Sequence, residues 1–262
     1  MTDAASVGGP SRTARVDAVN ALRFLLRADV TAQLRSYRSL VLNFALPAIL
    51  LFAASQGKRA SRLGGPNAVV NLALTVGLVS IGTVAYSMAV ARDRDNGVLQ
   101  RLRATPAPTW TIMGSRWIVQ LGAVVVMSVM VFIVAALLDN ITFTATGYFF
   151  TLLVALLGSA VFLSIGQAIV GLIPSADTLN AAGRLVYVPL IGLSLFGQSD
   201  LLGTPFEMVS RWSPGGCLET LLSATTGAAS WSGETWGAIL ACLCYTLVFA
   251  GIGIRWFRWT AR

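Results

Sequence analysis

The sequence predicts an all-α integral membrane protein with six transmembrane helices, an N-terminal interfacial amphipathic helix, and a candidate re-entrant segment between spans five and six. Of 262 residues, 55% are hydrophobic and only 11% are charged, whereas soluble domains carry roughly 25% charged residues. The charged residues also cluster and leave long uncharged stretches between them. Because a helix of about 20 apolar residues crosses a bilayer, the membrane is the expected solvent.

The N-terminal arm precedes the first apolar stretch. Residues 1–15 are rich in small and turn-forming residues and are expected to be a disordered lead. In residues 16–38, apolar side chains recur every three or four positions, the period of one helix face: Val16, Val19, Leu22, Leu26, Val30 and Leu34. The flanking arginines favour a helix lying in the membrane interface, and a solvated surface helix is the alternative. No apolar core typical of a cleavable signal peptide precedes Leu40, so the first span is expected to remain in the mature chain.

Six uncharged stretches are long enough to be spans. They lie near residues 39–57, 68–91, 116–138, 147–173, 180–199 and 234–255. The fifth must begin before Arg184, whose side chain would reach toward the headgroups or, alternatively, face a substrate path. Residues 39–255 are therefore expected to form a single transmembrane domain, and residues 256–262 a cytoplasmic tail.

The connection between spans five and six, residues 199–233, is broken by several glycines and prolines. Two short apolar runs within it, residues 201–209 and 217–224, could be half-helices that dip into the outer leaflet. Such segments are tolerated where protein buries the loose backbone. An ordinary extracellular loop remains the alternative.

The orientation follows from the basic residues. Most of the 19 Lys and Arg residues lie in the N-terminal arm, the second loop and the tail, and basic residues in short loops stay on the cytoplasmic side. Both termini are therefore expected in the cytoplasm. The abundance of Arg and Ala suggests a GC-rich bacterial genome, and so the bacterial inner membrane. Anionic lipid headgroups account for the net charge of +8 without nucleic acid.

The sequence lacks the residues that several kinds of binding site need. The chain has no histidine, and its three cysteines have no metal-ligand spacing, so no metal site is expected. The only Gly-Lys pair, Gly57-Lys58, is followed by Arg59 and does not form a phosphate loop. This chain is therefore not expected to bind ATP by that motif, and no cofactor is expected in it.

The loop after span two carries the most specific pattern. It reads Arg-Asp-Arg-Asp-Asn-Gly-Val-Leu-Gln-Arg-Leu-Arg-Ala-Thr-Pro over residues 92–106. Asp95 or Asn96 could cap a short helix that Pro106 ends. Leu99 and Leu102 would share one face, and we expect that face to point outward into a groove on a cytoplasmic partner.

This loop resembles the signature of membrane subunits of type 2 ABC exporters in the drug and lipid branch: acidic-Arg-acidic-x-Gly-(Thr/Val)-Leu-x-x-Leu-x-x-Thr-Pro. The match runs from Asp93 to Pro106, with aspartates in place of the usual glutamates and Gln100 where that family often has an acid. The basic arm, Pro47 in the first span and the Trp212-Ser213-Pro214 segment are also similar to that family.

The resemblance implies an ATP-driven exporter of multidrug-efflux or antibiotic-resistance type, in which this chain is a permease and not an enzyme. Two copies of a separate ATPase subunit would bind ATP and magnesium and dock on the loop. A second membrane subunit, identical or homologous, would complete the path. The loop residues expected to couple to the ATPase are Asp93, Arg94, Asp95, Gly97, Leu99, Arg101 and Leu102.

The substrate path is expected to be mostly apolar, because no Asp or Glu lies well inside a predicted span. Amphipathic drug-like or lipid-like cargo therefore fits better than a small ion. Polar residues within spans usually bond between helices, and some could line the path. The candidates are Tyr86, Ser87, Asn180, Tyr187, Ser194 and Gln198.

Two other classes are weighed against the exporter. An ion-coupled secondary transporter should show inverted repeats and interrupted spans in matching halves, and no clear repeat relates residues 39–138 to 147–255. An intramembrane enzyme would need a base beside its nucleophile, and the predicted spans contain neither histidine nor paired carboxylates.

Overall fold

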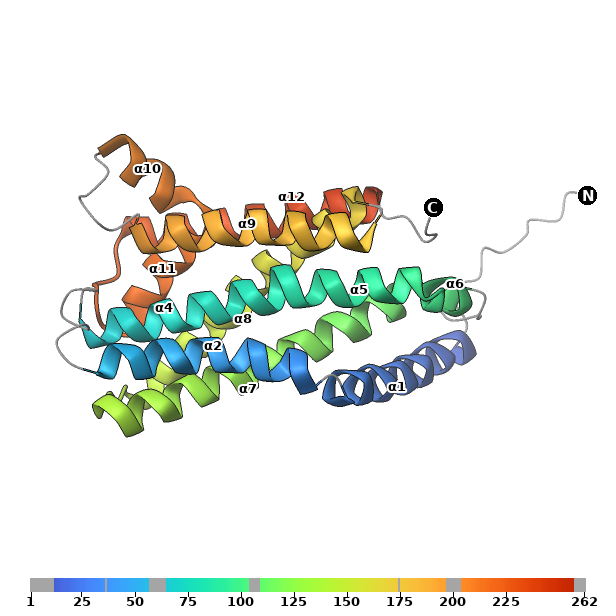
Figure 1. Ribbon diagram of the computed structural model, residues 1–262, viewed down its shortest axis with the longest axis horizontal. Coiled ribbons are helices and arrows are strands. Elements are labelled where there is room, and N and C mark those ends of the chain that lie inside the picture. Colours follow the sequence, from blue (N-terminus) through green and yellow to red (C-terminus); the bar gives the residue numbers. More distant parts are fainter. Residues whose placement is uncertain are drawn as a thin grey trace, which may run out of the picture.

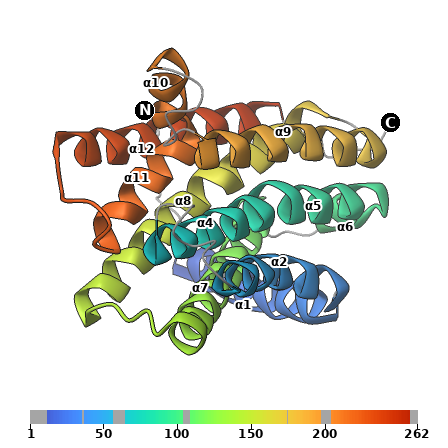
Figure 2. The ribbon, with the colours of Figure 1, turned by 60° about the vertical axis from the view of Figure 1, so that its left-hand side comes forward.

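The computed structural model describes residues 12–35, 37–56, 65–103, 109–173, 175–196 and 204–256, and every regular element in these ranges is a helix. The helices form an elongated bundle, with α1 (Arg12–Arg35) and α6 (Val98–Arg103) at one end and α10 (Thr204–Trp212) and α11 (Pro214–Thr225) at the other (Figures 1 and 2). We refer to these as the α6 end and the α11 end.

Helix α1 packs against α7 (Thr109–Asp139). It begins earlier than the sequence predicted, because residues 12–15, assigned to a disordered lead, are helical and include Ala14 and Arg15, both good helix formers. Several large apolar side chains on α1 are exposed, namely Val19, Phe24, Val30 and Leu34. This apolar exposure supports the interfacial position predicted for α1.

The second predicted span is a rod of three segments: α4 (Pro66–Val79), the π-helix η1 (Ser80–Ala85) and α5 (Tyr86–Asp95). The π-helical turn lies against α8 (Ala145–Leu172). Glycines allow this close approach, since a Cβ atom on Gly82 would lie 2.6 Å from that of Phe162. The rod and α8 therefore pack backbone to backbone, as small residues permit in membrane helices.

In the part of the chain that the structure describes, four helices are long and apolar enough to cross a membrane: Pro66–Asp95, Thr111–Asp139, Ala145–Leu172 and Gly233–Arg255. They correspond to predicted spans two, three, four and six. Within the described residues, the apolar part of α2 (Tyr37–Ser55) is shorter, Asn43–Ser55, and α9 (Ala176–Phe196) is not among the four. Both lie lengthwise in the bundle beside the rod (Figure 1). The all-α membrane fold is confirmed, and the count of six spans stays a prediction.

Helix α9 begins at Ala176, before Arg184, as the sequence predicted, and Arg184 is exposed. The two short helices predicted between spans five and six are present as α10 and α11. Ser213 accepts a hydrogen bond from the Gly216 amide, and Pro214 occupies the first turn of α11. Because α11 packs against α4, α8, α9 and α12 (Gly233–Arg255), its backbone is enclosed by protein, as a re-entrant helix requires.

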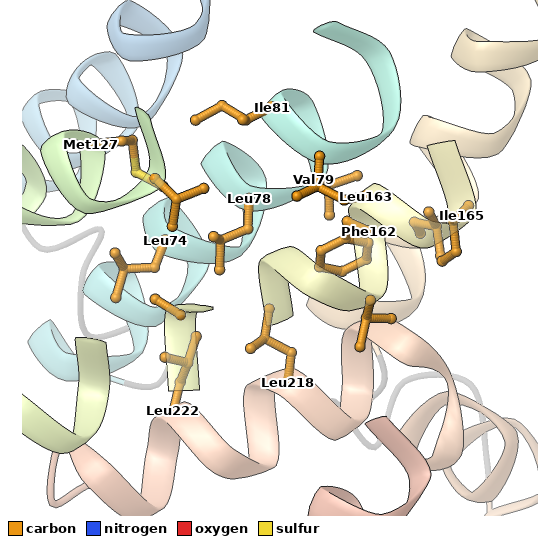
Figure 3. Close-up of a cluster of buried hydrophobic side chains, with 14 of the residues drawn as sticks. Leu74, Leu78, Val79, Ile81, Met127, Phe162, Leu163, Ile165, Leu218 and Leu222 are labelled. Carbon is orange, nitrogen blue, oxygen red and sulfur yellow. The ribbon is translucent and has the colours of Figure 1, made fainter. Parts of the chain in front are cut away.

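The apolar core joins the rod, α7, α8 and α11 (Figure 3). It includes Leu74, Leu78, Val79, Ile81, Met127, Phe162, Leu163, Ile165, Leu218 and Leu222. Leu218 contacts Gly158 of α8 so closely that a Cβ atom there would lie 2.6 Å from the leucine Cδ1. Helix α11 is thus an integral part of the core and not an appended loop.

Candidate functional site

The rod ends at the segment that the sequence singled out. Residues 92–95, predicted to lie in a loop, form the last turn of α5, so this part of the prediction is wrong. The helix breaks at Asn96 and Gly97, because Gly97 adopts a φ of +70°, which glycine reaches at little cost. The Asn96 amide donates to the Arg92 carbonyl at 2.9 Å, and α6 follows at once.

Arg94 points into the protein. Only 1% of this residue is exposed, and its guanidinium donates to the carbonyl oxygens of Val170 at 3.1 Å and Ile173 at 3.0 Å. These carbonyls lie at the C-terminal end of α8, where backbone acceptors lack helical partners and the helix dipole favours a cation. Arg94 therefore fastens the end of α5 to the end of α8.

Asp93 connects the same turn to α7. Its carboxylate accepts from Arg116 at 2.7 Å, and Arg116 is 8% exposed. The adjacent Ser115 hydroxyl donates to Asp29 of α1 at 2.6 Å. Burial raises the pKa of Asp29, and the hydrogen bond from Ser115 and the charge of Arg116 partly oppose this. The last turn of α5 is thus bonded to α7 and α8, and α7 is bonded to α1 beside it.

Helix α6 turns its apolar side toward the bundle. Leu99 is completely buried and Leu102 is half-buried, so the prediction that both leucines point outward is wrong. The two leucines share one face, as their spacing requires. That face packs against the chain's own core, because burial there removes its apolar area from water. Among the described residues from Asp95 to Leu102, four are exposed: Asp95, Asn96, Gln100 and Arg101. We call these four residues the α6 surface.

The predicted path residues fall into two groups. On α5, Tyr86 and Ser87 are buried against α8, where the Tyr86 hydroxyl donates to Gln167 and Ser87 donates to the Gly166 carbonyl at 3.1 Å. Both bond between helices within this chain.

On α9, Ser194 is buried and donates to the Leu190 carbonyl at 2.9 Å. Asn180 and Tyr187 are half-buried on the same helix. Gln198 lies outside the described residues.

The sequence reading missed a polar cluster at the α11 end. Glu219 of α11 is 7% exposed. Nearby, Asn71 of α4 donates to the Ser223 hydroxyl at 3.2 Å and accepts from Thr226 at 3.2 Å. The sequence signal of this cluster is the single acid within the apolar run 217–224, a run too short to be a span and therefore not covered by the expectation of uncharged spans.

The fold and this junction define a class of protein: a helical membrane protein in which the last turn of the second predicted span is bonded to two other helices of the bundle. A family model for ABC-2 type transporters matches residues 20–218. The chain belongs to this family, and it is therefore the membrane subunit of an ABC transporter and a permease. No curated protein matches it.

Proposed function

We propose that this permease is part of an ATP-driven exporter that moves an amphipathic, drug-like or lipid-like substrate across the bacterial inner membrane. The observation that carries the proposal is the α5–α6 junction in a chain of the ABC-2 family. There a small exposed polar surface stands directly on a turn that is bonded to α7 and α8, and α7 is in turn bonded to α1. Such a turn is suited to receive a force from a cytoplasmic partner and to pass it to the bundle.

The partner is proposed to be an ABC ATPase subunit, in two copies, which would supply the ATP and magnesium sites. It would contact the α6 surface, where Asp95 and Arg101 present charges of both signs. Charged and polar groups at the edge of an interface fix orientation and association rate. The α6 end would then face the cytoplasm, with both chain termini on that side. A second membrane subunit, identical or homologous, would complete the translocation path.

Transmission would run from the α6 surface through the last turn of α5. The buried Arg94 connects it to α8, and Asp93 connects it to α7 through Arg116. Charge-assisted hydrogen bonds are among the stronger and more directional polar contacts in proteins. A displacement of α6 would therefore move α7 and α8 as well, and with them α12, which packs along α8.

The substrate class rests on the polarity of the described spans. Their serines, threonines and Tyr86 largely bond to backbone or to neighbouring helices, and no carboxylate lies within the four apolar spans apart from their terminal turns. A proton or metal-ion path usually needs a chain of such groups. Amphipathic cargo moving between the bundle and lipid does not.

The proposal can be tested by purifying the tagged chain in mild detergent with its ATPase and reversing two charges of the α6 surface. The double variant Asp95→Lys/Arg101→Glu should lose at least about tenfold of the copurifying ATPase, the size expected for about 1.4 kcal/mol of lost binding. The matched control is Arg255→Glu, an exposed arginine at the end of α12. Undiminished copurification, or export driven by an ion gradient without ATP, would contradict the proposal.

A further inference from the structure

A cavity of about 370 Å³ lies at the α11 end, where α9, α10 and α11 meet the start of α12. Its volume is within the range of small-molecule binding sites, but its wall is more polar than theirs usually is. Seven of its lining residues are serines or threonines, and three are charged: Glu207, Arg211 and Glu234. The cavity therefore suits a polar or charged group and not a purely apolar one.

The three charged side chains form one connected set, which we call the Arg211 ion-pair group. Arg211 donates to one oxygen of Glu207 and to one oxygen of Glu234, each at 2.7 Å. Among the described residues, the second oxygen of each carboxylate has no hydrogen-bond partner. The side chains of Glu207 and Glu234 are 33% and 58% exposed, so a molecule in the cavity can reach them. The group thus offers two free acceptors and one negative charge in excess.

The hydroxyl groups that a ligand can reach add further acceptors. Thr220 is half-buried and donates to the Gly216 carbonyl at 3.0 Å. Ser223 is also half-buried and donates to Glu219 at 3.4 Å. Because each hydroxyl proton is directed into the chain, the hydroxyl oxygen is left to accept from a ligand. A ligand that matches this wall carries a positive charge and several N–H donors.

A second cavity, of about 300 Å³, touches the same ion-pair group and supplies an apolar wall. It is lined by Met208 and Trp212 of α10, which are 69% and 45% exposed. The indole of Trp212 is held against α12, since a Cβ atom on Gly237 would lie 2.8 Å from the ring. An aromatic face next to carboxylates attracts a cation and also covers hydrocarbon. The two cavities together therefore match a cation with an apolar chain.

We infer that these two cavities bind a primary alkylammonium ion. Its N–H groups would donate to the free oxygens of Glu207, Glu234 and Thr220. Its alkyl chain would lie against Met208 and Trp212. In the proposed orientation the α11 end faces away from the cytoplasm, so the site would hold cargo near the point of release. Only the naming of the ligand as cargo rests on the proposed function, because binding needs this chain alone.

Other head groups match the wall less well. A carboxylate or phosphate would meet the excess negative charge of the Arg211 ion-pair group. A quaternary ammonium carries the positive charge but has no N–H, and an alcohol has one donor and no charge. Phosphatidylethanolamine has a primary ammonium, but its phosphate would lie close to the carboxylates. Unfavourable charges and unpaired acceptors of this kind exclude the wrong ligand.

The experiment measures the thermal midpoint of the full chain in a non-ionic detergent during titration with n-octylammonium. The comparison ligands are octyltrimethylammonium, octanol and a short-chain phosphatidylethanolamine. At about ten times its Kd, octylammonium should raise the midpoint by about 3 °C, and the others at the same concentration by less than about 1 °C. An equal shift with octyltrimethylammonium or octanol would overturn the inference. An equal shift with phosphatidylethanolamine would show a lipid headgroup site instead.

The decisive variant is Glu207→Gln/Glu234→Gln, which reverses the net charge of the Arg211 ion-pair group at nearly unchanged volume. Both residues are partly exposed, and exposed ion pairs add little to stability, so the variant should fold. Its Kd for octylammonium should be at least about tenfold higher. The matched control is Asp139→Asn, a half-buried carboxylate at the end of α7 outside both cavities, which should bind as the unmodified chain does. Unchanged affinity in the double variant would overturn the inference.

The comparison of ligands uses the unmodified chain, so it decides the inference even if the double variant fails to fold. Its outcome is also separate from the test of the proposed function. Octylammonium binding by a chain that does not copurify with an ATPase would contradict the proposed exporter and leave the site in place. ATPase copurification by a chain that shows no preference for octylammonium would overturn the site alone.

Discussion

The four long apolar helices fall into two pairs that differ in their surroundings. In the central pair, Pro66–Asp95 and Ala145–Leu172, 72% and 61% of the most apolar stretch is buried within the chain. In the peripheral pair, Thr111–Asp139 and Gly233–Arg255, the corresponding values are 28% and 17%. Thr111–Asp139 is also the most apolar of the four. A span that faces lipid must be uniformly apolar, whereas a span that faces protein can carry polar side chains if they find partners.

The largest effect is expected from filling the contact between the central helices. A Cβ atom on Gly166 would overlap the Gly82 carbonyl oxygen, which is backbone and cannot turn aside. Gly166→Leu should cost about 3 kcal/mol or more and remove most of the folded protein. The measurement is the monodisperse yield from size-exclusion chromatography. Gly122→Leu on peripheral α7, where a Cβ atom meets nothing within 4 Å, is the control and should express normally.

A smaller effect is expected from releasing the end of α8. Arg94→Met keeps the length of the side chain but deprives the Val170 and Ile173 carbonyls of their donor, at a cost of about 2 kcal/mol. Thermal unfolding measures this cost. Arg94→Lys should recover part of it, because an ammonium can still donate but cannot form both bonds with the same geometry. If Arg94→Met were as stable as the unmodified chain, the two hydrogen bonds from Arg94 to α8 would contribute nothing to the free energy of unfolding.

The thermal stability of the chain should depend on pH through Asp29, where α1 packs on peripheral α7. Because the folded-state pKa of Asp29 is raised above 3.8, its stabilising effect is complete below that value and is lost as pH rises through the raised pKa. Asp29→Asn removes this titration but can still accept from Ser115. The difference in thermal midpoint between the variant and the unmodified chain should therefore grow with pH across the acid range. Parallel curves would refute this.

The smallest effect is expected on the outer face of α12. Leu247 is 74% exposed within the chain, so Leu247→Ala leaves no cavity and should change stability by less than about 0.5 kcal/mol. Chemical denaturation in detergent would measure it. A loss above about 2 kcal/mol, the lower end of the range for core leucine truncations, would show that another protein surface and not lipid covers this face.

The sequence could predict the helical membrane fold because apolar length and basic-residue distribution depend on the solvent, not on tertiary contacts. The two apolar runs 201–209 and 217–224 fell within about three residues of α10 and α11, although an ordinary loop was the alternative. Patterns of this kind do not state how a helix is rotated. Leu99 and Leu102 were correctly assigned to one face, yet which way that face turned depended on the packing of α6 on the bundle.

Arg94 shows the same limit more sharply. Next to Asp93 and Asp95 it looks like part of a charged surface loop, and the carbonyls that bind it are more than 70 residues away in the chain. Glu219 lies in a segment too short to qualify as a span, so the prediction that the spans contain no carboxylate did not include it. Both are cases in which a polar residue is buried because a distant backbone or side chain provides its partner.

The π-helical turn η1 also fixes the angular phase between the two halves of the rod. Each residue of an α-helix advances about 100° around the axis, and a π turn arises from one extra residue within an otherwise α-helical run. Deleting one residue from Ser80–Ala85 could restore an unbroken α-helix of almost the same composition. Because the wide turn accommodates the extra residue in nearly the rotation of a normal α turn, this deletion would leave Arg94 and Asp93 near their partners, whereas a deletion in the α-helical part of α4 or α5 would swing both away from them. The rod can therefore absorb a change of one residue in length at this turn but not elsewhere, and a sequence comparison should place a one-residue gap within Ser80–Ala85 and not in α4 or α5.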